Sequence, residues 1–188
     1  MKTYIQFLAL SIFFLSCSNS GKEEKKDTDS VTETTINDKN NTMTTVDEGS
    51  ADFLRKVANS GMAEVEITAM AQQKAVNQPV KDLAAMLHHD HSMLNDQVKS
   101  LAAQKNIMLP DSMSSDKRDM INDLQKRSGR NFDKAFLDMM VKSHKTGIEL
   151  FESTGTSVSD PDISNLAKNT LPTLRAHLDS ATLLQKRY

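Results

Sequence analysis

Four ionisable side chains occupy positions where a helical pattern calls for apolar residues: Glu64, His91, His144 and His177. In the stretch LAAMLHHDHSML (83–94), His91 continues an apolar seam at i, i+3/i+4 spacing, so we expect it to face the core. The other members of that seam are Ala84, Leu87, Leu94, Val98 and Leu101. Burying an imidazole costs free energy unless a hydrogen bond or a metal ion satisfies it. The rest of the sequence must therefore supply partners for His91.

Three imidazoles and one carboxylate form a donor set that can hold one divalent transition-metal ion. We predict a single-metal site whose ligands are Glu64, His91, His144 and His177, and this set does not select among Zn, Cu, Fe and Mn. Further groups could orient these ligands or add to them, namely His88, Asp90 and Arg175.

The alternative is a buried polar layer that binds nothing. Glu64 could pair with one or two of the histidines, which would fix the packing of the helices at a cost in desolvation. In that case the protein would act through its surface, as an envelope interaction or stress-protection module. The sequence offers no nucleophile–base pair, Gly-rich phosphate loop or paired acid carboxylates, so any enzymatic activity would have to come from a bound metal.

Hydrophobic periodicity predicts four long helices that position these residues, over 50–75, 79–105, 131–152 and 161–185. Ser50 is the predicted N-cap of the first, Asp160-Pro161 starts the last, and Pro172 should kink it. Each of the four polar residues lies within about one turn of the middle of its helix, so in a bundle they should share one layer. The segment 106–130 is far longer than a hairpin turn and should contain one short helix that ends near Gly129.

The N-terminus has the features of an export signal. Lys2 precedes an apolar run over 5–15, and the sequence FLSC ends on Cys17, the only cysteine. FLSC resembles a bacterial lipobox, so we predict a signal peptide over 1–16 and a lipidated Cys17 that attaches the protein to the membrane. The alternative is an ordinary cleaved signal with a free thiol. Residues 17–49 are polar and should form a disordered tether before a helical domain over 50–186.

Composition limits the remaining function classes. A net charge of −2, with basic residues interspersed among acidic ones, gives no basic face for nucleic acid. The abundance of Met, Leu, Ala, Lys and Glu, with 5% aromatic residues, is typical of an all-α protein. The partners left open by the sequence are a second copy of the chain and another envelope protein.

Several stretches resemble a family of bacterial outer-membrane proteins known as domain of unknown function 4142. They are ADFLRKVANSGMAEVEI, MLHHDH, SGRNFDKAFLDMMVKSHKTGIELFE and NTLPTLRAHL, and together they span roughly residues 50 to 186. The resemblance implies an envelope location, facing the periplasm or the cell surface. It also implies a ferritin-like four-helix bundle with a short extra helix in the crossover between the second and third long helices. The chain lacks the two Glu-x-x-His motifs of ferritin-like di-iron proteins, so the resemblance does not extend to that centre.

Overall fold

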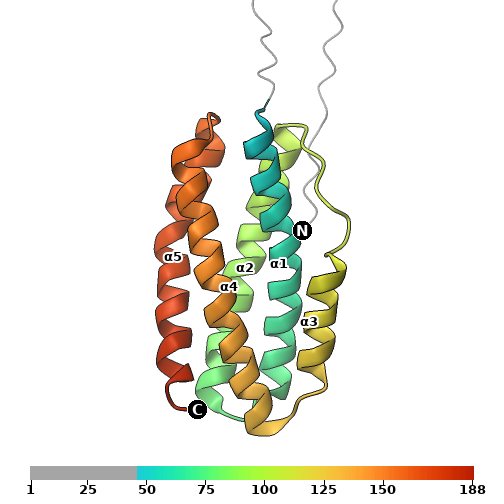
Figure 1. Cartoon of the computed structure of the whole chain (residues 1–188), viewed down its shortest axis with the longest axis vertical. Coiled ribbons are helices and arrows are strands. Elements are labelled where there is room, and N and C mark those ends of the chain that lie inside the picture. The colour runs from blue at the N-terminus through green and yellow to red at the C-terminus, as the bar shows by residue number, and fades with distance from the viewer. Residues whose placement is uncertain (1–45) are drawn as a thin grey trace, which may run out of the picture. The chain divides into compact units, whose positions relative to one another are not determined.

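The computed structural model describes residues 46–188, which form five helices (Figure 1). These are α1 (Glu48–Lys74), α2 (Gln78–Gln104), α3 (Ser115–Gln125), α4 (Gly129–Ser157) and α5 (Pro161–Gln185). The predicted signal peptide, Cys17 and the predicted tether up to residue 45 lie outside the described residues. No helix within 46–188 has the length and apolar character needed to cross a bilayer.

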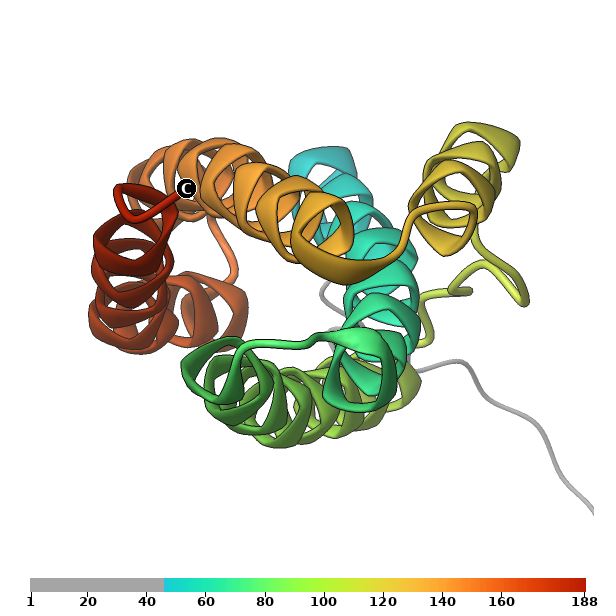
Figure 2. The same ribbon diagram turned by 90° about the horizontal axis from the view of Figure 1, so that it is seen from below.

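The four long helices form a bundle made of two antiparallel hairpins, α1–α2 and α4–α5 (Figure 1). The connection from α2 to α4 runs the length of the bundle and carries α3, which packs on the outside against α1 and α4 (Figure 2). This long crossover is the feature that distinguishes ferritin-like bundles from simple up-down bundles. The predicted fold class, including the short extra helix in the crossover, is therefore confirmed.

The first helix begins earlier than predicted. Asp47, not Ser50, is the N-cap, because its carboxylate accepts hydrogen bonds from the Ser50 amide at 2.8 Å and the Ser50 hydroxyl at 2.9 Å. The same carboxylate accepts a bond from the Ser159 hydroxyl at 2.7 Å, which ties the start of α1 to the α4–α5 turn. Residues 48 and 49, predicted as the end of the tether, are thus helical.

Two predicted boundaries around α4 are also wrong. The short helix α3 ends at Gln125 rather than near Gly129, and Gly129 instead starts α4 with a φ of +56°. The predicted loop after Glu152 is helical up to Ser157, because Gly155 is buried against α5 and its carbonyl accepts a bond from the Ser164 hydroxyl at 2.9 Å. Packing of this turn outweighs the weak helix propensity of its Ser, Thr and Gly residues.

A buried carboxylate closes the end of the bundle where the chain finishes. Asp133, which is fully buried, accepts hydrogen bonds from the amides of Val76 and Asn77, each at 3.0 Å. It also accepts a bond from the Tyr188 hydroxyl at 2.9 Å, and burial together with this bond raises the pKa of Tyr188 to about 12. Asp133 therefore joins the α1–α2 turn, the start of α4 and the C-terminal residue.

The apolar core consists of two clusters, one toward each end of the bundle. The cluster near the α1–α2 turn is built around Phe132, Phe136 and Met140, and the cluster at the opposite end is built around Phe53 and Phe151. A layer of buried histidines lies between them. The histidine layer thus interrupts a core that is otherwise continuous.

Candidate metal centre

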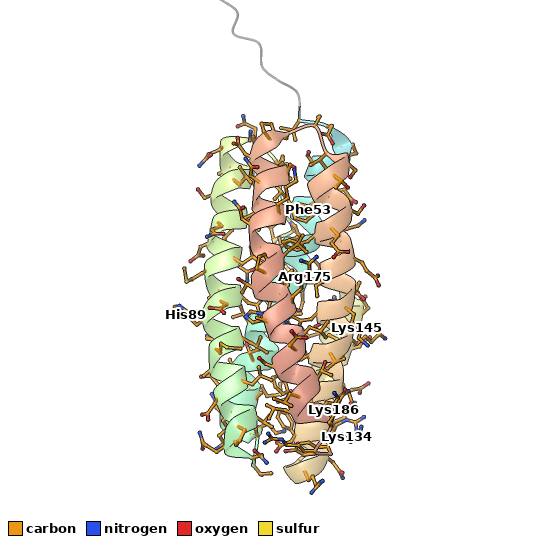
Figure 3. The ribbon with its side chains drawn as sticks, turned by 90° about the vertical axis from the view of Figure 1, so that its left-hand side faces the viewer. Phe53, His89, Lys134, Lys145, Arg175 and Lys186 are labelled. Atoms are coloured by element: carbon orange, nitrogen blue, oxygen red, sulfur yellow. The ribbon has the colours of Figure 1, made fainter. Side chains whose placement is uncertain are left out.

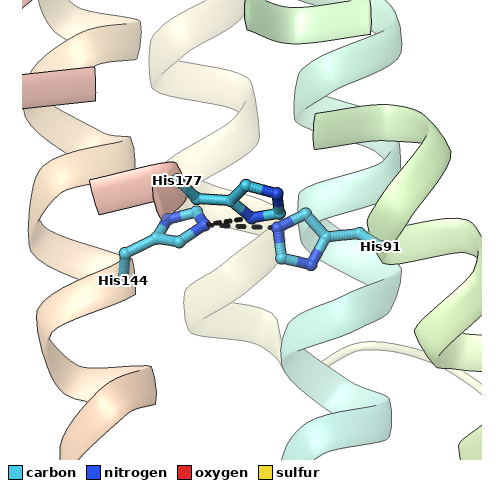
Figure 4. A group of neighbouring side chains, drawn as sticks. All are labelled: His91, His144 and His177. Atoms are coloured by element: carbon cyan, nitrogen blue, oxygen red, sulfur yellow. Dashed lines mark hydrogen bonds between the residues drawn. The ribbon is translucent and has the colours of Figure 1, made fainter. Parts of the chain in front are cut away.

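Three histidines from three helices meet in that layer. His91 on α2, His144 on α4 and His177 on α5 are 3%, 1% and 2% exposed. Their ring centroids lie 5.3–5.4 Å apart, so the three rings form a nearly equilateral triangle (Figure 4). Nε2 of His144 lies 3.3 Å from Nε2 of His91 and 3.3 Å from Nδ1 of His177. Each ring therefore turns one nitrogen toward a common point.

The second nitrogen of each ring faces an oxygen acceptor. Nδ1 of His91 lies 3.1 Å from Oε2 of Glu64, and Nε2 of His177 lies 2.9 Å from Oδ2 of Asp90. Nδ1 of His144 lies 2.9 Å from the backbone carbonyl of Met140. Such outer hydrogen bonds fix the orientation of metal-binding imidazoles and strengthen them as ligands.

These outer contacts assign the ring protons. Carbonyls and ionised carboxylates only accept hydrogen bonds, so the nitrogen facing each of them carries the proton. A neutral imidazole has one such proton, and the three nitrogens that face one another are then unprotonated. Three lone pairs directed at one point repel each other unless a cation lies among them. The chemistry of the donor set thus calls for a shared proton or a metal ion.

The spacing of the inward nitrogens suits a metal ion. Ligands about 2.0–2.1 Å from a tetrahedral ion lie about 3.3–3.4 Å from each other, which follows from the Zn–N bond length. His144 Nε2 lies 3.3 Å from the inward nitrogen of each of the other two rings, and all three nitrogens lie within 4.8 Å of one another. The three histidines therefore fit a single metal ion bound by one nitrogen of each ring.

Burial disfavours the protonated form of two of these imidazoles, those of His144 and His177. Loss of solvent lowers the pKa of His144 to about 4, against an opposing contribution from the Glu64 carboxylate. Burial also lowers the pKa of His177, although the hydrogen bond to Asp90 acts in the opposite direction. Both rings are therefore neutral at pH 7: each keeps the proton on its outer nitrogen, and its inward nitrogen is available as a ligand.

The structure places Glu64 differently from the predicted ligand set. Its carboxylate binds the outer nitrogen of His91, with the side chain 16% exposed, and does not face the point shared by the three inward nitrogens. Asp90, predicted to support the site, contacts His177 and is 33% exposed. The two carboxylates thus play equivalent parts on two different histidines.

The other predicted supporting residues lie away from the cluster. Nδ1 of His88 lies 3.2 Å from the Val65 carbonyl and 3.3 Å from the Thr68 hydroxyl, so it links α2 to α1. Arg175 pairs with Glu152 at 2.7 Å, and both side chains are about half exposed. Figure 3 shows Arg175 on the α5 side of the bundle and His89 on the outer side of α2.

The Met140 carbonyl is a contact of the site that was not predicted from the sequence. Every residue has a backbone carbonyl, so the residue type gives no signal for this contact. Met140 does precede His144 by four residues in the same helix, where its carbonyl lies within reach of the ring. The spacing alone was the available signal.

Comparison with known proteins supports the fold. The model of domain of unknown function 4142 matches residues 36–184. Two kinds of solved structure are similar. A DUF305 fragment from Deinococcus radiodurans is 12% identical with a TM-score of 0.68, covering 76% of this chain and 99% of that one. CopM in its Cu(I)-bound and Cu(II)-bound forms is 17% identical with a TM-score of 0.64, covering 73% and 96%. A comparison with curated proteins gave no match.

Proposed function

We propose that this chain, which belongs to the family of domain of unknown function 4142, binds one transition-metal ion in the bundle core. The ligands are His91, His144 and His177. The name of the family assigns no activity. The observation that carries the proposal is that the two nitrogens of each ring face different partners. One nitrogen of every ring is held by an acceptor, and the other is directed at a common point. A polar layer that only filled the core would have no need for three convergent lone pairs.

Copper is the ion we propose first, and zinc is the alternative. Imidazole nitrogens suit both, and a nitrogen site generally binds Cu²⁺ more tightly than the other divalent first-row metals. Glu64 and Asp90 would balance the charge of a divalent ion without contacting it. The similarity to CopM, whose structures are described as copper-bound, is consistent with this choice but extends to the fold alone.

The test is metal titration of the purified protein with elemental analysis. We expect the wild-type protein to bind one equivalent of Cu²⁺. His144→Gln should weaken binding by more than the roughly 10–100-fold that loss of an outer hydrogen-bond partner costs. His89→Gln is the matched control, because His89 lies on the exposed side of the same helix as His91 and outside the cluster.

Two results would contradict the proposal. One is substoichiometric metal under all loading conditions, and the other is equal affinity in wild type and His144→Gln. Either would favour the alternative function, a bundle that acts through its surface and uses the histidines as a hydrogen-bonded layer.

We also propose that the protein is an envelope lipoprotein attached through lipidated Cys17, on the outer membrane and facing either the periplasm or the cell surface. The support is the FLSC sequence after an apolar run, and the polar segment that separates it from the bundle. Cys17→Ser should move the protein from the membrane fraction to the soluble fraction. Unchanged partitioning would contradict lipidation.

A further inference from the structure

The histidine cluster can be approached from two opposite sides of the bundle. Between α2 and α5 a groove of about 350 Å³ reaches His91 and His177. Between α1 and α4 a smaller pocket of about 80 Å³ reaches His91, His144 and Glu64. A buried metal site needs an entry path, and these two hollows adjoin it.

The two hollows differ in the side chains that line them. The groove carries oxygen-bearing side chains along both walls, and these are Asp90, Gln97, Asn169, Thr170 and Thr173. Apart from Glu64 and the histidines, the pocket offers only the hydroxyls of a few Ser and Thr side chains, and Leu150 and Phe151 make part of its wall apolar. Removing an ion from water is costly, so a path that offers oxygen contacts at each step is strongly preferred.

The charges along the groove also suit a cation. It continues along α2 and α5 into a second hollow of about 530 Å³, and the two share Gln97, Leu166 and Asn169. Within residues 46–188 no lysine or arginine lines either hollow, whereas Asp90 and Asp96 do. Asp96 has Lys99 at 3.7 Å, and Asp162, which also lines the second hollow, has Lys105 at 2.6 Å. Asp90 has no such lysine or arginine partner among residues 46–188, and it lies at the inner end of the groove with its carboxylate on His177. An acidic cleft concentrates cations and raises their rate of association.

We propose that the α2/α5 groove is the entrance through which a hydrated divalent cation reaches the three histidines. This inference rests on the proposed metal-binding function. The cation meets the side-chain oxygens of the groove first, then Asp90, and passes between His91 and His177 to the inward nitrogens. The α1/α4 pocket takes no part in uptake.

The experiment compares variants that narrow one hollow or the other. Thr173→Phe and Asn169→Phe place a ring in the groove from exposed positions on α5, so neither disturbs the core. Gly147→Leu fills the α1/α4 pocket, where a Cβ at residue 147 would have nothing within 4 Å. Stopped-flow absorbance measures uptake of Cu²⁺, transfer to a chelating dye measures release, and circular dichroism verifies folding.

We expect the two groove variants to slow uptake at least about 10-fold, and Gly147→Leu to leave it unchanged within about two-fold. Because one path serves both directions, release should slow by the same factor, and Kd should stay constant. Unchanged uptake in both groove variants, or slow uptake only in Gly147→Leu, would overturn the entrance while leaving the metal site in place. If the wild-type protein takes up no metal at all, the proposed function and the entrance are both overturned.

Discussion

In each of the three buried imidazoles one nitrogen contacts an oxygen acceptor and the other faces the two neighbouring rings. The two contacts have different roles. The outer contacts with Glu64, Asp90 and the Met140 carbonyl fix the ring and its proton, and the inner nitrogens would provide the ligands of the proposed metal site. A histidine that lost its outer partner could turn or exchange tautomers. Affinity at this site should therefore depend on residues that do not touch the ion.

Glu64→Gln and Asp90→Asn should each weaken metal binding by about 10–100-fold, as loss of an outer partner does at other metal sites. A neutral amide balances no charge and can present its NH₂ group to the ring, which would favour the wrong tautomer. Asp82→Asn is the control, because its carboxylate is exposed on α2 and accepts a bond from Gln78. Titration with a competing chelator measures all three. Equal affinities in the three variants would contradict the outer role of the carboxylates.

Stability of the metal-free protein should fall as the pH drops below about 6.5. Burial lowers the pKa of His144 to about 4 in the folded protein, whereas the ring has its ordinary pKa of 6.5 in the unfolded chain. Between these two pH values the unfolded chain therefore binds more protons than the folded protein. The loss should approach about 3 kcal/mol near pH 4 from this group alone, at about 1.4 kcal/mol per pH unit. Urea unfolding at pH 7.5 and pH 4.5, with a chelator present, measures the change. His144→Gln should flatten the dependence, and an identical slope in that variant would contradict the assignment.

For single residues, the sequence predicted which side chains meet but not which of their atoms make the contacts. Helical seams and mid-helix positions brought His91, His144 and His177 to one layer, because side-chain direction in a helix follows from spacing. They could not decide which nitrogen of a ring faces inward. Glu64 was consequently assigned to the ion, although it binds the outer nitrogen of His91.

At the scale of the helices, two glycines occupy opposite environments. A Cβ at Gly147 would have nothing within 4 Å, whereas one at Gly61 would collide with the Asn95 side chain. Gly147→Ala should stabilise the protein by about 0.5–1 kcal/mol, because glycine inside a helix costs about that much. Gly61→Ala should destabilise it by about 1 kcal/mol or more through overpacking. Urea denaturation of the two variants gives the comparison, and the same sign for both would contradict this account of the two glycine environments.

Asp47→Ala should destabilise the protein by about 1–2 kcal/mol, because it removes the N-cap of α1. Hydrogen bonds from the Ser159 hydroxyl and the Ser50 amide lower the pKa of Asp47 to about 2, so this stabilisation is complete above pH 4 and is lost as the pH falls toward 2. Asp52→Ala, which removes an exposed pair with Lys56, is the control and should cost less than about 1 kcal/mol. Thermal unfolding at pH 7 distinguishes the two, and equal losses would contradict the capping role.

Most helices could be predicted, and the helix ends could not. Long amphipathic periods identified the four long helices because burial of one face dominates their stability. The ends depend on particular contacts, such as Asp47 with Ser159 across the bundle or Ser164 with the Gly155 carbonyl. These partners are distant in sequence or lie in the next helix, so local propensity did not reveal them.

For the whole molecule, the bundle consists of two hairpins with extensive contacts inside each and sparse contacts between them. The histidine cluster crosses this boundary, with His91 on the first hairpin and His144 and His177 on the second. A bound ion should therefore stabilise the weaker of the two kinds of interface. Metal binding and hairpin docking are then coupled.

A saturating metal ion should raise the free energy of unfolding by about 2.7 kcal/mol at a free concentration 100 times Kd. Calorimetry of the protein with Cu²⁺ and with a chelator measures the shift in Tm. His144→Gln should show no shift, because its ligand set is incomplete. A shift of the same size in that variant would place the stabilising ion elsewhere.

The division of ligands between the hairpins also affects the order of events during biogenesis. In an unfolded chain His91 is separated from His144 by more than 50 residues, so the proposed high-affinity site would not exist. The proposed site would form only when the second hairpin docks on the first. Metal acquired in this way would come from the compartment in which folding is completed, whatever ions the chain met during synthesis.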